Sequence, residues 1–119
     1  MRLLFVCVGN TCRSQMAEAI ARDMGHYARS AGTNPGHRVA ENAVKALSDI
    51  GVDASGLEPK SVDSIDSSGF DRIISMGCGV ECPALPIDED WGLEDPVGRG
   101  ESAYSATRDE ILERLSNLT

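Results

Sequence analysis

The sequence predicts an α/β fold, a flavodoxin-like doubly wound parallel sheet of four strands with helices on both of its faces. Short apolar segments alternate with longer segments of helical periodicity, which is the order of elements that a parallel sheet requires. The first of these segments, Leu3–Val6, is a continuous apolar run, as expected for a strand buried on both faces. With 119 residues, of which 41% are apolar and 25% charged, the chain is expected to form a single domain over residues 1–119.

The first strand and the first helix are recognised by the residues that end them. The apolar run stops before Gly9, and Ser14 is a good N-cap for the helix that follows. That helix is expected over 14–24, with Gly25 as its stop. A second short strand is then expected over 26–31.

The later elements follow from the same signals. Helices are expected over 38–50 and 102–118, because apolar residues recur there at helical spacing. The inner positions of these helices are expected to be Val39, Ala43, Val44 and Leu47 in the first, and Ala106, Ile111, Leu112 and Leu115 in the second. The other expected elements are strands over 71–76 and 83–87, a helical turn over 61–65 and an acidic loop over 88–100.

Composition and charge exclude several classes of function. The 19 acidic and 11 basic residues give a net charge of −8, and no cluster of Lys and Arg is present, so we expect no nucleic-acid partner. The apolar run near the start is far shorter than the roughly 20 residues that cross a bilayer, and no small-residue cleavage site follows it. We therefore expect a cytoplasmic monomer without a signal peptide, a membrane span, a cofactor or a bound metal.

The loop after the first strand predicts an oxyanion cradle with a nucleophile at its base. Arg13 follows Cys7 by six positions, and the loop leads into a helix, whose end presents free N–H groups and about half a positive charge. The positive potential favours the thiolate of Cys7, Arg13 supplies a planar fork of donors, and Ser14 can donate a hydrogen bond to the thiolate. The residues expected to bind the oxyanion are Val8, Gly9, Asn10, Thr11, Cys12, Arg13 and Ser14.

The segment Val6 to Glu18 resembles the low-molecular-weight tyrosine phosphatase superfamily, and most closely its thioredoxin-coupled arsenate reductases. The similarity spans essentially the whole chain, through Ser30-Ala31-Gly32, Cys82-Pro83, Trp91-Gly92, Asp95-Pro96 and Arg108 to Ile111. The resemblance implies the low-molecular-weight tyrosine phosphatase fold. It also implies an arsenate reductase that works through a cysteine relay, with arsenate as substrate and phosphate as a competing oxyanion.

The resemblance gives roles to three further residues. Asp95 is expected to be the general acid that protonates a leaving oxygen. Cys78 is expected to attack the arsenic adduct on Cys7, which releases arsenite, and Cys82 is expected to attack the resulting disulfide and free Cys7. The final Cys78–Cys82 disulfide implies thioredoxin as the external reductant, with a mycothiol and mycoredoxin-type thiol system as the alternative. Gly77 and Gly79 are expected to help this segment move.

Several alternatives stay open. Val97 stands where phosphatases of the superfamily usually carry an aromatic residue, which weakens phosphotyrosine recognition, and hydrolysis of phosphate monoesters through a phosphocysteine at Cys7 is the second interpretation. A non-enzymatic anion-binding or phosphocarrier module is the third. Cys78 and Cys82 could instead be inert thiols or half of a zinc site, and Cys12 could be a packed side chain or a disulfide partner of Cys7.

One further expectation concerns a cation site. Asn10, Glu18 and Ser30 match positions that resemble a potassium site of some arsenate reductases of this type. Lys60 stands where the remaining carboxylate of that site is expected. The Lys60 ammonium is therefore expected to take the place of the cation near Glu18, the alternative being a solvated loop lysine.

Overall fold

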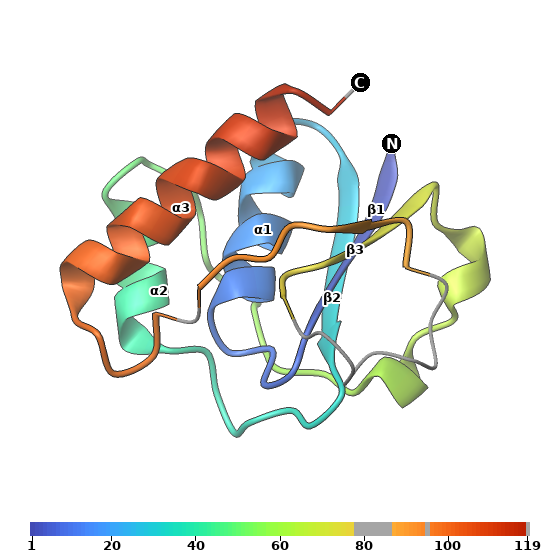
Figure 1. Ribbon diagram of the computed structural model, residues 1–119, viewed down its shortest axis with the longest axis horizontal. Coiled ribbons are helices and arrows are strands. Elements are labelled where there is room, and N and C mark those ends of the chain that lie inside the picture. The colour runs from blue at the N-terminus through green and yellow to red at the C-terminus, as the bar shows by residue number, and fades with distance from the viewer. Residues whose placement is uncertain (78–86, 95, 119) are drawn as a thin grey trace.

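Parallel strands form the centre of the fold in a computed structural model, which describes residues 1–77, 87–94 and 96–118 (Figure 1). Within those residues the sheet has four strands in the order β2-β1-β3-β4, and each neighbouring pair is parallel. The strands are β1 Arg2–Cys7, β2 Tyr27–Gly32, β3 Arg72–Ser75 and β4 Glu89–Asp90. This order confirms the predicted α/β fold with a doubly wound sheet.

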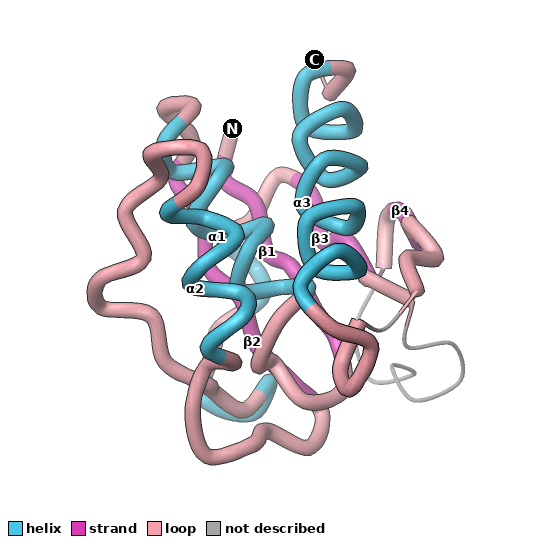
Figure 2. Tube along the Cα trace, turned by 90° about the vertical axis from the view of Figure 1, so that its left-hand side faces the viewer, coloured by secondary structure: helices cyan, strands magenta, loops and turns pink. Residues whose placement is uncertain are grey.

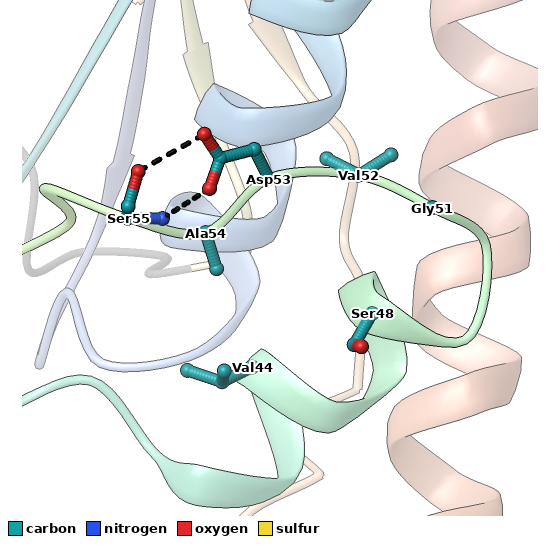
Figure 3. A pocket seen from close by; sticks show the side chains of 7 residues that line it. All are labelled: Val44, Ser48, Gly51, Val52, Asp53, Ala54 and Ser55. Carbon is teal, nitrogen blue, oxygen red and sulfur yellow. Dashed lines mark hydrogen bonds between the residues drawn. The ribbon is translucent and has the colours of Figure 1, made fainter.

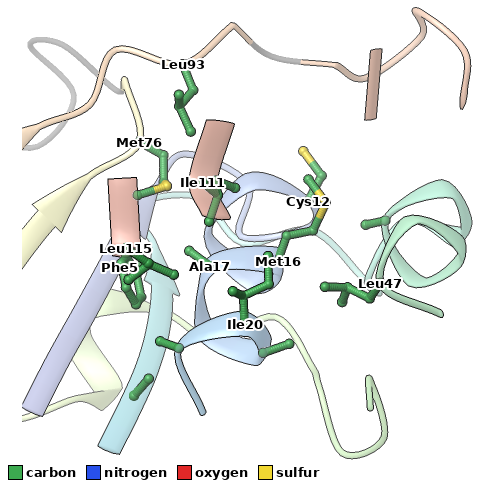
Figure 4. Close-up of a cluster of buried hydrophobic side chains, with 14 of the residues drawn as sticks. Phe5, Cys12, Met16, Ala17, Ile20, Leu47, Met76, Leu93, Ile111 and Leu115 are labelled. Atoms are coloured by element: carbon green, nitrogen blue, oxygen red, sulfur yellow. The ribbon is translucent and has the colours of Figure 1, made fainter. Parts of the chain in front are cut away.

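Within the described residues the three α-helices pack together on one side of the sheet, so the prediction of helices on both faces holds for the second face only through two short 3₁₀ helices. The α-helices are α1 Arg13–Asp23, α2 Glu41–Ser48 and α3 Glu101–Ser116, and each contacts the other two (Figures 1 and 2). Leu3 and Phe5 of β1 point into the apolar cluster under these helices, part of which Figure 4 shows. The intervening Leu4 and Val6 face the other side, as the two-residue period of a strand requires. That side is covered by the segment that holds two 3₁₀ turns, η1 Val62–Ser64 and η2 Ser67–Gly69.

The helix predictions were correct in position and partly wrong in detail. Helix α2 is shorter than expected, and Val44 is 40% exposed while Ala46 is buried in its place. Likewise, Ala106 of α3 is exposed and Tyr104 is buried. Both helices also pack against other helices, so the buried stripe is rotated from the predicted one.

The last strand is the largest departure from the expectation. Of the strand predicted over 83–87, residues 83–86 lie outside the described part of the chain. On the side away from β1, β3 pairs with Glu89–Asp90, inside the segment that was predicted to be an acidic loop. Two acidic residues can form this strand because, among the described strands, it lies at the edge of the sheet, where side chains reach water.

Two features of the surface lie apart from the Cys7 loop. A pocket of about 550 Å³ lies at the end of α2 (Figure 3). Its lining residues come from α2 and the following segment, and they are Val44, Ser48, Gly51, Val52, Asp53, Ala54 and Ser55. As for membranes, none of the helices in the described residues combines the length and the apolar character that a bilayer crossing needs.

Candidate active site

The Cys7 loop lies at the carboxyl end of the sheet, at the point where the strand order reverses. Cys7 is the last residue of β1, and α1 begins at Arg13. From β1 the chain passes to β2 on one side and then to β3 on the other, which is where doubly wound sheets bind ligands. The fold therefore places the predicted cradle at its usual ligand-binding position.

The segment 33–40 turns the carbonyl groups of the loop outward. Its backbone N–H groups donate to four loop carbonyls, namely Thr33 to Cys7 at 3.1 Å, Asn34 to Val8 at 2.9 Å, Gly36 to Gly9 at 2.9 Å and Ala40 to Thr11 at 2.8 Å. In a planar trans peptide the N–H points away from the preceding carbonyl. The N–H groups that follow these carbonyls therefore face the inner side of the loop, where an anion would be held.

The sulfur of Cys7 makes two hydrogen bonds inside this loop. The backbone N–H of Asn10 donates to Cys7 Sγ at 3.1 Å, and Ser14 Oγ lies 2.9 Å from the same sulfur. Cys7 is 2% exposed and is a free thiol. Asn10 has a φ of 51°, a left-handed conformation that asparagine tolerates better than most residues. The loop is thus bent so that its own N–H group reaches the sulfur.

Hydrogen-bond directions around Asn10 show which way the Ser14 hydroxyl points. The backbone N–H of Lys60 can only donate, and it lies 2.8 Å from the Asn10 amide oxygen Oδ1. The other amide atom, Nδ2, is therefore a donor, and it lies 2.7 Å from Ser14 Oγ. Ser14 thus accepts from Asn10 and keeps its own proton to donate. In the thiolate form of Cys7 the sulfur has no proton, so the Ser14 hydroxyl is the donor in the 2.9 Å contact.

Ser14 is consequently not the N-cap that the sequence suggested. Cys12 occupies the N-cap position of α1, without a side-chain capping bond, and Ser14 lies in the first turn. The hydroxyl is committed to Cys7 and Asn10 instead of to a free N–H group of the helix. The Cys12 side chain is 3% exposed and packs in the apolar cluster, as a small packed residue would (Figure 4).

The guanidinium of Arg13 is held by backbone carbonyls on one side. Its Nη1 donates to the carbonyl oxygens of Met76 at 3.0 Å and Leu93 at 2.9 Å, and the residue is 7% exposed. Its Nε is buried and has no hydrogen-bond partner within the described residues. A buried N–H group without a partner is costly, so the Nε edge is available for an oxyanion.

Gln15 supports the Cys7 loop from behind with hydrogen bonds that the sequence did not predict. Gln15 Nε2 donates to the Asn10 carbonyl at 3.0 Å, to Asn10 Oδ1 at 3.1 Å and to the Glu58 carbonyl at 2.8 Å. Gln15 is fully buried in the first turn of α1. Its position within the segment 6–18 could have indicated this role, because a buried polar side chain next to the loop needs hydrogen-bond partners.

Glu18 is the centre of the expected cation position. Its carboxylate is 1% exposed and accepts a hydrogen bond from Ser30 Oγ at 2.8 Å. Lys60 Nζ lies 3.5 Å from Glu18 Oε1, and the Lys60 side chain is 16% exposed, so the ammonium is next to Glu18 as expected and is not a solvated loop lysine. Arg22 Nη1, which was not foreseen, lies 3.1 Å from the other carboxylate oxygen.

Three predicted site residues lie outside the described residues. Asp95, Cys78 and Cys82 therefore keep the roles predicted from the sequence, without a described geometry. Their neighbours in the chain are described, since Gly77 precedes Cys78 and Leu93 lies two positions before Asp95. Val97, at the position that is usually aromatic in the phosphatases, is 54% exposed.

The similarity to known proteins extends over nearly the whole chain. The model of the family described as low molecular weight phosphotyrosine protein phosphatase matches residues 2–119. The chain is 36% identical to a glutaredoxin arsenate reductase of Synechocystis sp., with 98% of this chain and 95% of that protein covered. It is 35% identical to an arsenate reductase of Staphylococcus aureus, with 98% and 94% covered.

Solved structures with the same fold include enzymes of both kinds. An arsenate reductase in the phosphate binding state has a TM-score of 0.89 at 35% identity, covering 98% of this chain and 94% of that one. A low molecular weight protein tyrosine phosphatase from T. tengcongensis has a TM-score of 0.82 at 30% identity, covering 98% and 95%. A thioredoxin-dependent arsenate reductase of Corynebacterium glutamicum has a TM-score of 0.76 at 33% identity, covering 98% and 58%.

Proposed function

Because the chain belongs to the low molecular weight phosphotyrosine protein phosphatase family, we propose that it reduces arsenate to arsenite by a cysteine relay that begins at Cys7. The observation that carries the proposal is the Cys7 sulfur, buried at the base of a loop that offers it two hydrogen bonds. The sequence and structural similarity to several arsenate reductases, over nearly the whole chain, supports arsenate as the substrate.

The first step is an attack of the Cys7 thiolate on arsenate. A sulfur–arsenic bond forms, one arsenic–oxygen bond breaks, and the oxygen leaves as water after taking up a proton. We assign that proton to Asp95. The negative charge that arsenate brings is held by the inward N–H groups of the loop and by the free Nε edge of Arg13.

The second step transfers two electrons to arsenic. The Cys78 thiolate attacks Cys7 Sγ, a disulfide forms, and the sulfur–arsenic bond breaks with its electron pair going to arsenic, which leaves as arsenite. The Cys82 thiolate then attacks Cys78, and Cys7 departs as a thiolate. The Cys78–Cys82 disulfide is finally reduced from outside, and Cys7 is ready for another arsenate.

Ser14 and Asn10 keep Cys7 ready for this chemistry. Their two donors face the sulfur, at 2.9 and 3.1 Å, and hydrogen bonds to a charged group are stronger than those to a neutral one. One donor lies in the loop and the other in the first turn of α1, and both already reach the sulfur without movement. The same donors stabilise Cys7 when it is the leaving group in the last thiol exchange.

The external reductant in the proposal is thioredoxin. An intramolecular disulfide between two nearby cysteines is the kind of substrate that thioredoxin reduces. Relatives differ in this respect, since one is named a glutaredoxin arsenate reductase and a structural neighbour is named thioredoxin-dependent. A mycothiol and mycoredoxin-type system stays the alternative partner.

Arsenate-dependent NADPH oxidation with thioredoxin and thioredoxin reductase tests the proposal. Wild-type protein should turn over many times, and Cys7→Ser, Cys78→Ser and Cys82→Ser should each stop multiple turnover. A parallel series with glutathione, glutaredoxin and glutathione reductase identifies the partner. Turnover that survives in Cys82→Ser with thioredoxin alone would rule out the relay.

Phosphate monoester hydrolysis is the second candidate function. The similarity to a tyrosine phosphatase structure favours it, because the same loop can hold a phosphoryl group on Cys7. Val97 argues against phosphotyrosine, since an exposed valine offers little surface for a phenyl ring. Hydrolysis of p-nitrophenyl phosphate by Cys82→Ser, together with no arsenate reduction by the wild type, would favour this second function.

A further inference from the structure

Arg13 is tied to two segments that are far away in the sequence. Its Nη1 donates to the carbonyls of Met76, at the end of β3, and of Leu93, after β4. The Leu93 N–H also donates to the Met76 carbonyl, at 3.2 Å. The side chains of Met76 and Leu93 are 0% and 6% exposed and belong to the main apolar cluster (Figure 4). These acceptors are therefore fixed by core packing.

The two bonds determine which edge of the guanidinium remains for a ligand. Nη1 carries two N–H groups, and two carbonyl oxygens lie within hydrogen-bond distance of it. The planar group cannot rotate about its own bonds without losing one of these acceptors. The Nε edge is thereby kept in one direction, which is the condition for planar, bidentate binding of an oxyanion.

Gly77 lies next to the junction that Arg13 Nη1 forms with the carbonyls of Met76 and Leu93. Its φ is +113°, a value that side-chain-bearing residues rarely adopt. A Cβ at this position would lie 3.1 Å from the Leu93 carbonyl oxygen and 3.3 Å from both Arg13 Nη1 and the Leu93 nitrogen. All three atoms belong to the junction, and two of them are backbone atoms that the core holds in place.

We propose that Gly77 is a positioning residue for Arg13: its lack of a side chain allows Nη1 to reach both carbonyls, and this directs the Nε edge toward the oxyanion. The proposal rests on the proposed function of Arg13 in binding the oxyanion. It gives Gly77 a role besides the expected freedom of movement. It also links the affinity for the anion to the backbone just before Cys78.

The test compares two glycine variants with the same kind of backbone strain. Gly25 has a φ of +95° and nothing within 4 Å of the position of its Cβ, so Gly25→Ala carries the strain without the contacts. Dissociation constants for phosphate and arsenate are measured by calorimetry for wild type, Gly77→Ala and Gly25→Ala. Gly77→Ala should bind both anions about tenfold or more weakly, the loss expected for one charge-assisted hydrogen bond. Gly25→Ala should bind them within about twofold of the wild type.

Wild-type affinity in Gly77→Ala, or an equal loss of affinity in both variants, would overturn the proposal. Because the readout is binding, a wild type that binds phosphate but reduces no arsenate would refute the proposed function and leave this comparison decisive. A wild type that binds neither anion would overturn both.

A second measurement needs no variant. In NMR spectra of the ¹⁵N-labelled wild type without any anion, the Arg13 Nη1 protons should be resolved from each other and exchange slowly with water. Averaged, rapidly exchanging Nη protons would show that the carbonyls do not hold the guanidinium, and the proposal would be wrong even if Gly77→Ala failed to fold.

Discussion

Replacing Ser14 with alanine removes the only side-chain hydroxyl that, within the described residues, faces the Cys7 sulfur. Ser14 Oγ lies 2.9 Å from Sγ and accepts from Asn10 Nδ2 at 2.7 Å, and it is the donor to the sulfur whenever Cys7 is a thiolate, which has no proton to give. The variant leaves the Asn10 N–H bond to sulfur in place. The perturbation therefore removes one of two donors without changing the loop's sequence on either side of it.

The size of the effect follows from the charge on the acceptor. A hydrogen bond to a charged group contributes about 1.5–3 kcal/mol, and about 1.4 kcal/mol corresponds to a factor of ten in an equilibrium constant. Alkylation of Cys7 by iodoacetamide at a fixed neutral pH should thus be slower by about tenfold or more in Ser14→Ala. The rate of the first chemical step at neutral pH should fall by about tenfold or more.

The assay follows the time profile of Cys7 alkylation at neutral pH by mass spectrometry, with fragment ions separating Cys7 from Cys12. Ser30→Ala is the matched control, because Ser30 is also fully buried and its hydroxyl bonds to Glu18 instead of to Cys7. Ser30→Ala should lose stability but keep the wild-type alkylation profile. An unchanged profile in Ser14→Ala would refute the assignment of the hydroxyl proton to the sulfur.

Three further predictions concern other parts of the molecule. Gly32→Ala should lower the free energy of unfolding by about 1–3 kcal/mol, because its Cβ would lie 2.5 Å from a loop carbonyl oxygen; an unchanged denaturant midpoint would contradict this. Lys60→Met should lower the free energy of unfolding by up to about 3 kcal/mol, and added potassium should restore part of it. The wild type has the Lys60 ammonium 3.5 Å from Glu18, so neither its stability nor its activity should depend on potassium. Hydrogen bonds from the Ser55 N–H, and then from its hydroxyl, hold the pKa of Asp53 below its ordinary value (Figure 3). The ionised carboxylate therefore stabilises the folded protein at any pH above the ordinary pKa of Asp. This stabilisation is lost as the pH falls through the lowered pKa of the folded state. Ser55→Ala should raise this pKa in an NMR titration; a fall would show that the hydroxyl bond does not stabilise the carboxylate.

The parts of the fold that were predicted correctly are those with a local signal. The apolar run of β1 and the cysteine–arginine spacing after it are contiguous in the sequence, so they could be recognised together. Strand β4 has no such signal, because Glu89 and Asp90 are acidic and form a strand only through pairing with β3. Val44 was placed inside because size and polarity do not report how helices pack on each other.

The residues of the Cys7 loop lie together as the sequence predicted, the roles of Asp95, Cys78 and Cys82 stay predictions, and the contacts that support the loop were not predicted. Ser14 was correctly placed near Cys7 and wrongly made the N-cap, since a hydroxyl at a helix start can serve either purpose and the local sequence does not distinguish them. The bonds of Gln15 to Glu58 and of Arg13 to Met76 and Leu93 join residues 43 to 80 positions apart. Contacts between residues so far apart in the sequence depend on the topology of the sheet, so they cannot be predicted before the topology is known.

The most direct test of the relay is to stop it after its first disulfide. Cys82→Ser, incubated with arsenate and without any external thiol, should release one arsenite per protein and accumulate a disulfide between Cys7 and Cys78, both measured by mass spectrometry. The relay predicts this result because the thiol that would free Cys7 is missing. A protein that keeps Cys7 as a free thiol and releases no arsenite would contradict the account.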